Sequence, residues 1–170
     1  MNKRNTTIIG LGNPVLSDDA VGLHIVQRAK VLLDDLSEHV DFKENYSGGF
    51  DMLYDVIGYD RIIIVDCIIT GTCEPGTCIT YTLDDFYNLE QVRPFNSHSV
   101  NLPTIIEIGR KYDYQMPDEI IILGIEVKDI ETFSEKMTDK VDSSIDTIVG
   151  EIRKIITNHI NQKPYAFAAV

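Results

Sequence analysis

Four side chains of this sequence are of the types that bind divalent metal ions in proteins. Asp18 and Asp19 follow a glycine-containing turn in IIGLGNPVLSDDAVGLHIV (8–26), Asp66 ends the apolar segment RIIIVD, and His98 lies in the polar segment FNSHSVNLP. Each lies at a junction between expected elements, and in parallel sheets functional groups gather at the carboxyl ends of the strands. Two carboxylates and one imidazole form a hard-to-borderline ligand set with open coordination positions. The spacing therefore predicts a cation site at one edge of a sheet.

The turn within residues 8–26 begins like a phosphate-binding loop, but its later residues do not continue that pattern. A dinucleotide fingerprint needs a third glycine where Val15 stands, and the Gly-Lys-Ser/Thr of a P-loop is absent. Asp18 and Asp19 would also repel a phosphate at the N-terminus of a helix. Two simpler roles remain open: the adjacent carboxylates cap the helix, and Asp66 caps the turn after its strand.

The three cysteines are expected to be reduced structural thiols. Cys73 and Cys78 flank a Pro-Gly turn, and Cys67 follows Asp66 directly. A zinc site needs about four ligands at tighter spacing, and a buried free thiol is the commoner state of cysteine. Strand alternation places Cys67 on the opposite side of its strand from Asp66, which disfavours a cysteine nucleophile beside His98. We expect no role at this site for the remaining histidines, His24, His39 and His159.

Alternating strands and helices are expected to position these residues. Apolar runs bounded by turn residues predict strands at residues 6–11, 39–45, 61–66, 78–84 and 119–127. Helical periodicity predicts helices at 19–33, 50–58, 101–112 and 138–160, the first burying Val21, Ile25, Ala29 and Leu32. Because the strands are apolar throughout, we expect a single-domain three-layer α/β/α sandwich with a mostly parallel central sheet. The domain is expected to span 1–163, followed by a tail at 164–170.

Charge and hydropathy exclude several classes of partner. The 170-residue chain has a formal net charge of −12 and a pI near 4.6, which argues against binding nucleic acid or an anionic membrane. No apolar run approaches the length of a membrane span. The N-terminal residues turn into a strand and loop before any long apolar region, unlike a signal peptide. We therefore expect a cytoplasmic protein with reduced thiols.

Five motifs together resemble those of the hydrogenase maturation endopeptidases, which process the large subunit of nickel–iron hydrogenases. They occur in the family's order and spacing and cover roughly residues 6–160: GLGNPVLSDDAVG (10–22), IIIVDCI (62–68), PGT (75–77), SHSVNLP (97–103) and LGI (123–125). The resemblance implies that Asp19, Asp66 and His98 are the nickel ligands, since the first ligand is Glu or Asp among members. Asp18 matches the acidic residue that precedes this ligand, and either Asp18 or Asp19 is a candidate general base.

The resemblance also implies the reaction. Members of the family remove a short C-terminal extension from the large-subunit precursor after it has acquired nickel, so nickel is expected to arrive with the substrate. A water molecule is expected to attack the scissile carbonyl. Zinc or cadmium is expected to enter the same ligand set in crystals. One departure affects the substrate cleft: Tyr46 stands where the family commonly has glycine.

Two other functions are kept as alternatives. A self-sufficient metallo-amidohydrolase would hold its own metal, but the sequence lacks His-Glu-x-x-His and has few histidines. A non-enzymatic nickel carrier or assembly chaperone would use the same three ligands, but a carrier typically has a histidine-rich tract, which is absent. The function favoured by the sequence is a nickel-dependent processing endopeptidase acting on a hydrogenase large-subunit precursor.

Overall fold

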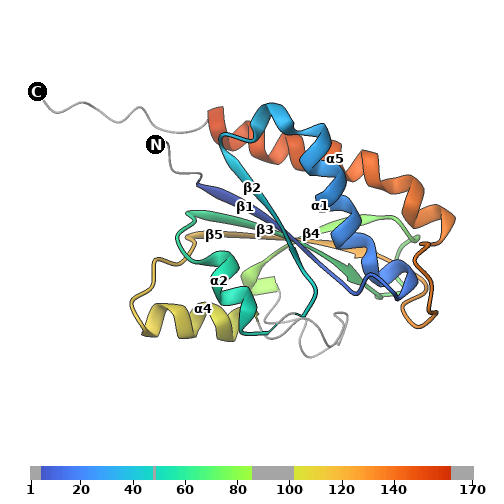
Figure 1. Cartoon of the computed structure of the whole chain (residues 1–170), viewed down its shortest axis with the longest axis horizontal. Helices are drawn as coiled ribbons and strands as arrows, with labels where there is room; N and C mark the ends of the chain where they lie inside the picture. Colours follow the sequence, from blue (N-terminus) through green and yellow to red (C-terminus); the bar gives the residue numbers. More distant parts are fainter. Residues whose placement is uncertain (1–4, 48, 86–101, 162–170) are drawn as a thin grey trace, which may run out of the picture.

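A five-stranded sheet forms the centre of the described part of the chain. The computed structural model describes residues 5–47, 49–85 and 102–161. Within these residues the strand order is β2-β1-β3-β5-β4 (Figure 1). The strands are β1 (Thr6–Leu11), β2 (Val40–Asn45), β3 (Arg61–Ile68), β4 (Cys78–Thr82) and β5 (Glu119–Glu126). β4 runs antiparallel to β5, whereas all other pairs are parallel, which confirms the predicted mostly parallel sheet.

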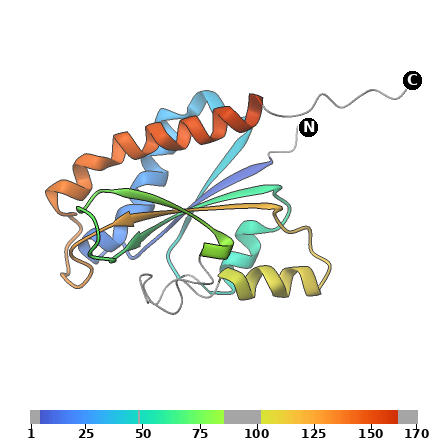
Figure 2. The ribbon, with the colours of Figure 1, turned by 180° about the vertical axis from the view of Figure 1, so that it is seen from behind.

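Helices cover both faces of this sheet. On one face lie α1 (Val21–Leu32) and α5 (Asp139–Asn161), and on the other lie α2 (Asp51–Val56) and α4 (Leu102–Lys111), as Figures 1 and 2 show. Two short 3-10 turns, η1 (Ser17–Ala20) and η2 (Asp34–Leu36), flank α1. The structure therefore confirms the three layers of the predicted α/β/α sandwich. Each of the four predicted helices corresponds to a helix of the described chain: α1, α2, α4 or α5. No helix among the described residues is long and apolar enough to cross a membrane.

The central strand β3 shows why the strands are apolar throughout. Ile63 and Val65 join the hydrophobic cluster under α1 and α5, whereas Ile62 and Ile64 join the cluster under α2 and α4. Each of these side chains is at most 2% exposed. Burying such a side chain contributes roughly 1.5–3 kcal/mol, so both faces of the strand stabilise the fold.

The C-terminal end of α1 differs from the prediction. Val21, Ile25 and Ala29 are buried as expected, but Leu32 is 39% exposed and Leu33 is 1% exposed. The helix ends at Leu32, and Leu33 leaves the helical conformation with φ −113° and ψ 26°. The Leu33 amide still donates to the carbonyl oxygen of Ala29, so Leu33 continues the four-residue spacing of Val21, Ile25 and Ala29 and fills the core in place of Leu32.

Two other element boundaries differ from the predicted ones. The helix predicted from residue 19 begins as the 3-10 turn η1 and becomes α-helical only at Val21, and β3 continues past Asp66 to Ile68. The predictions for His98 and for the tail at 164–170 fall outside the described residues.

Candidate functional site

Asp66 and Asp19 lie at the carboxyl-end edge of the sheet. Asp66 is near the end of β3, the middle strand, and is 3% exposed. Asp19 belongs to η1, which follows β1 after a short connection, and is 1% exposed. Because β1 and β3 are parallel neighbours, their carboxyl ends meet at one edge. The two carboxylates are thus in the place that the sequence predicted for them.

Two glycines allow η1 and α1 to approach the sheet this closely. A Cβ atom built on Gly22 would overlap the backbone carbonyl oxygens of Leu11 and Val65, and one built on Gly10 would overlap the carbonyl of Gly22. Only glycine permits such backbone contact. Gly10, the first glycine of the turn that resembles a phosphate-binding loop, therefore serves helix–sheet packing together with Gly22, and this packing sets the depth at which Asp19 lies.

Both carboxylate oxygens of Asp19 accept hydrogen bonds. Oδ2 accepts from the backbone amide of Asn13 at 3.2 Å, and Oδ1 accepts from the thiol of Cys67 at 3.1 Å. The turn after β1 and the end of β3 therefore hold this side chain from two directions. A carboxylate with this support has one well-defined orientation.

Asp66 has an unusually high pKa. Burial raises the pKa of Asp66 to about 7, the charge of Asp19 adds to this effect, and the backbone amide of Cys67 opposes it by donating to Oδ1 at 2.8 Å. Two carboxylates that share a buried site disfavour simultaneous ionisation. A divalent cation would relieve that repulsion, and a carboxyl that titrates near neutral pH suits acid–base chemistry.

Asp18, although adjacent to Asp19, has entirely different surroundings. Its carboxylate is fully buried and accepts hydrogen bonds from the residues that connect β5 to α5. Oδ2 accepts from the amides of Lys128 at 3.2 Å and Asp129 at 3.1 Å and from the hydroxyl of Thr138 at 3.0 Å, while Oδ1 accepts from the amide of Thr138 at 2.7 Å. Asp18 therefore ties η1 to the connection between β5 and α5.

Cys67 packs as strand alternation predicts, yet it contacts the site. It joins Ile63 and Val65 in the cluster under α1 and α5. Because η1 enters from that same face, Asp19 lies beside the thiol. The sequence analysis missed this contact, although the register of β3 and the position of the first helix carried a signal for it.

Glu126 is a further buried carboxylate at this edge, and the sequence analysis missed it. It ends β5 and is 2% exposed. It accepts hydrogen bonds from the amides of Thr70 at 2.9 Å and Gly71 at 2.8 Å, and from the Thr70 hydroxyl at 2.7 Å. The sequence carried the same signal for Glu126 as for Asp66, because both are acidic residues at the end of an apolar strand. It orders the turn that follows β3.

The third predicted metal ligand, His98, lies outside the described residues. Among the described residues, no group of three or more His, Cys, Asp or Glu side chains is arranged to hold a metal ion. The structure therefore brings together Asp19 and Asp66, and the complete three-ligand set stays a prediction.

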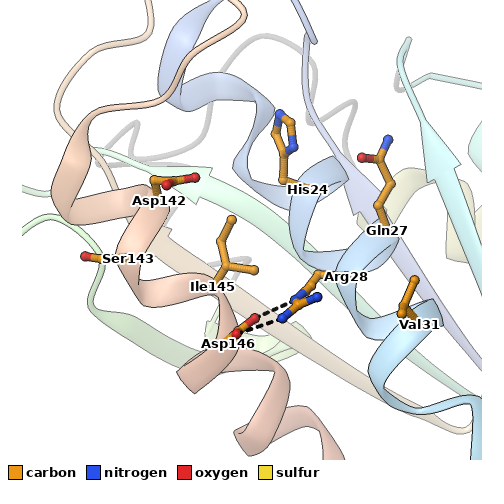
Figure 3. Close-up of a pocket in the computed structure, with 8 residues that line it drawn as sticks. All are labelled: His24, Gln27, Arg28, Val31, Asp142, Ser143, Ile145 and Asp146. Carbon is orange, nitrogen blue, oxygen red and sulfur yellow. Dashed lines mark hydrogen bonds and ion pairs between the residues drawn. The ribbon is translucent and has the colours of Figure 1, made fainter.

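A separate pocket of about 560 Å³ lies between α1 and α5 (Figure 3). Arg28 pairs there with Asp146 through two hydrogen bonds of 2.7 and 2.9 Å. Neither Asp19 nor Asp66 lines it. The lining residues come from the two helices: His24, Gln27, Arg28, Val31, Asp142, Ser143, Ile145 and Asp146. His24 thus shares a helix face with Gln27 and Arg28.

Comparisons with known proteins agree on one family. A family model described as hydrogenase maturation protease matches residues 24–155. A protein named as a hydrogenase maturation protease in Methanocaldococcus jannaschii is 28% identical over 163 residues, covering 91% of this chain and 100% of that protein.

Two solved structures have a similar fold. The hydrogenase maturating endopeptidase HybD of Escherichia coli matches with a TM-score of 0.76 and 19% identity, over 91% of this chain and 93% of that chain. The hydrogenase maturation protease HycI of Thermococcus kodakarensis matches with a TM-score of 0.70 and 19% identity, over 92% and 94%. At such low identity these structures support the fold.

Proposed function

This chain belongs to the hydrogenase maturation protease family, and we propose that it removes the C-terminal extension of a nickel-loaded hydrogenase large-subunit precursor at the edge formed by β1 and β3. The enzyme class, a peptidase, follows from the family. The observation that supports the location is the pair of buried carboxylates, Asp19 and Asp66, at the carboxyl ends of parallel strands. Parallel α/β folds bind their substrates at such an edge.

In this proposal nickel is part of the substrate. Asp19, Asp66 and His98 supply two oxygen donors and one nitrogen donor, which leave the nickel shell incomplete. Thiolates of the precursor, which are good ligands for such ions, would complete it. The precursor is then recognised both by its peptide and by its metal. Zinc or cadmium would occupy the same donors without supporting turnover.

The two adjacent aspartates have different roles in this proposal. Asp18 already accepts four hydrogen bonds, so abstracting a proton from water would require it to leave those donors. We therefore assign the general-base role to Asp19 and a positioning role to Asp18. Asp19 lies at the edge where the scissile carbonyl would meet the metal, and it deprotonates the attacking water there.

A reconstituted cleavage reaction tests the proposal. Wild-type enzyme is expected to shorten a nickel-loaded precursor and to leave a nickel-free precursor intact, even after the enzyme itself has been soaked in nickel. Asp19→Asn, Asp66→Asn and His98→Ala are expected to abolish cleavage. Asp35→Asn is the matched control, because Asp35 is an exposed partner of Arg153 on the α1/α5 layer.

Three results would overturn the proposal. Cleavage of nickel-free precursor by an enzyme that purifies with one bound metal ion would favour the self-sufficient metallo-amidohydrolase. Nickel transfer to the precursor without any cleavage would favour the carrier or chaperone. Cleavage by the three site variants at the wild-type rate would remove these residues from the reaction.

A further inference from the structure

We propose that Cys67 is a positioning residue that fixes the orientation of Asp19 for the incoming metal-bearing substrate. This inference rests on the proposed function, because it assigns a role relative to Asp19. Nothing in the three-ligand prediction requires a cysteine at this place.

Cys67 is placed to act on both carboxylates at once. Its backbone amide donates to Oδ1 of Asp66 at 2.8 Å, and its thiol donates to Oδ1 of Asp19 at 3.1 Å. Cys67 is 1% exposed, so water does not compete for either contact. One residue therefore links the strand-borne carboxylate to the carboxylate of η1.

Together with a backbone amide, the thiol holds both carboxylate oxygens of Asp19 by hydrogen bonds. The Asn13 amide donates to Oδ2 and the Cys67 thiol donates to Oδ1. Each carboxylate oxygen has further acceptor capacity, so both remain able to bind a metal or a water proton. A carboxylate held in this way needs no reorientation when the substrate binds, which is how supporting hydrogen bonds favour metal ligation.

The choice of side chain at this position can be tested by two substitutions. Cys67→Ala removes the donor. Cys67→Ser keeps a donor of similar volume on a shorter bond. Both substitutions reduce the volume of the side chain, but only serine keeps a hydrogen-bond donor. If Cys67→Ser retains more metal affinity than Cys67→Ala, the loss in Cys67→Ala comes from the missing hydrogen bond and not from packing. Cys78→Ser, in the edge strand β4, is the matched control.

Infrared spectroscopy of the metal-free full-length protein tests the hydrogen bond itself. The S–H stretching band of Cys67 is identified by subtracting the Cys67→Ala spectrum. Asp19→Asn replaces a charged acceptor by a weaker neutral one, so this band is expected to move to higher frequency, whereas Asp34→Asn, at an exposed position, leaves it unchanged. A Cys67 band that does not respond to Asp19→Asn would overturn the inference, whatever the enzyme cleaves.

Calorimetric titration with Ni²⁺ or Cd²⁺ tests the consequence. Removing a supporting partner of a metal ligand typically weakens affinity by about 10–100-fold, and we expect this for Cys67→Ala with a smaller loss for Cys67→Ser. Wild-type affinity in Cys67→Ala, while Asp66→Asn loses binding, would refute the positioning role and leave the proposed function standing.

Two further outcomes are decisive. A sulfur-to-nickel charge-transfer band that disappears in Cys67→Ser would make Cys67 a ligand and overturn the positioning role. If neither Asp19→Asn nor Asp66→Asn changes metal binding, the proposed metal site is wrong. The infrared result then still decides whether Cys67 positions Asp19.

Discussion

Replacing Asp18 by alanine is expected to destabilise the protein strongly, although Asp18 is proposed to take no part in the chemistry. The substitution leaves three backbone amides and one hydroxyl, all from residues 128–138, without their acceptor. Each buried donor without a partner costs about 1–3 kcal/mol. Entry of water into the space and local relaxation keep the total below the sum, so we expect a loss of about 3–5 kcal/mol.

Thermal and urea unfolding of the purified variants measure this loss. For a chain of this size each kcal/mol lowers the melting temperature by about 2–4 °C, so the expected decrease is on the order of 10 °C. Asp34→Ala is the matched control, since Asp34 is exposed in η2 and its melting temperature should stay near the wild-type value. The melting temperature of Asp18→Asn is expected to lie between those of Asp18→Ala and Asp34→Ala, because an amide has one acceptor oxygen where the carboxylate has two. An Asp18→Ala variant that melts with the control would refute the role of this residue as the tie to the β5–α5 connection.

Three further predictions concern pH, packing and the third ligand. Burial raises the pKa of Asp66 to about 7, so between roughly pH 4 and 7 the folded protein holds a proton that the unfolded chain has released, and the free energy of unfolding should fall as pH rises through this window. Across that range the urea midpoint of the wild type should fall relative to that of Asp66→Asn; equal slopes would contradict the raised pKa. Gly22→Ala should lower the melting temperature sharply, because its methyl group would overlap the carbonyl oxygens of Leu11 and Val65; an unchanged melting curve would show that the helix shifts without penalty. His98→Ala should abolish precursor cleavage on a gel while unfolding within about 0.5 kcal/mol of the wild type, and a large loss of stability would make His98 a structural residue instead.

Sequence patterns located the elements well, because each depends on residues close together in the chain. The strand at 6–11 was predicted to the residue, and β3 was predicted within two residues of its end. Leu32 was assigned to the core in error, because Leu32 and Leu33 both fit helical spacing from Ala29, by three and by four residues, and only the packing selects Leu33. The last turn of α1 ends one residue before the side chain that fills the core.

The candidate site shows where local patterns stop being informative. Asp18 and Asp19 are adjacent and chemically identical, so nothing in their own segment tells them apart. What separates them is contact with residues far along the chain: Lys128, Asp129 and Thr138 surround the first, and Cys67 touches the second. The sequence identifies Asp18 and Asp19 as candidates, but only the packing of η1 between two strand ends shows that they have different surroundings.

That division explains how the fold holds the carboxylates of Asp19 and Asp66 close together. Gly10 and Gly22 bring η1 down onto the sheet, and the buried bonds of Asp18 anchor it there. The repulsion felt by Asp66 is thereby opposed by interactions made during folding, before any substrate binds. A site built in this way favours a divalent cation when one arrives, because the carboxylates are already oriented and their mutual repulsion is relieved by its charge. In the proposed function, that positive charge arrives with the nickel of the precursor, so the proposed specificity would rest on the electrostatics of these two carboxylates.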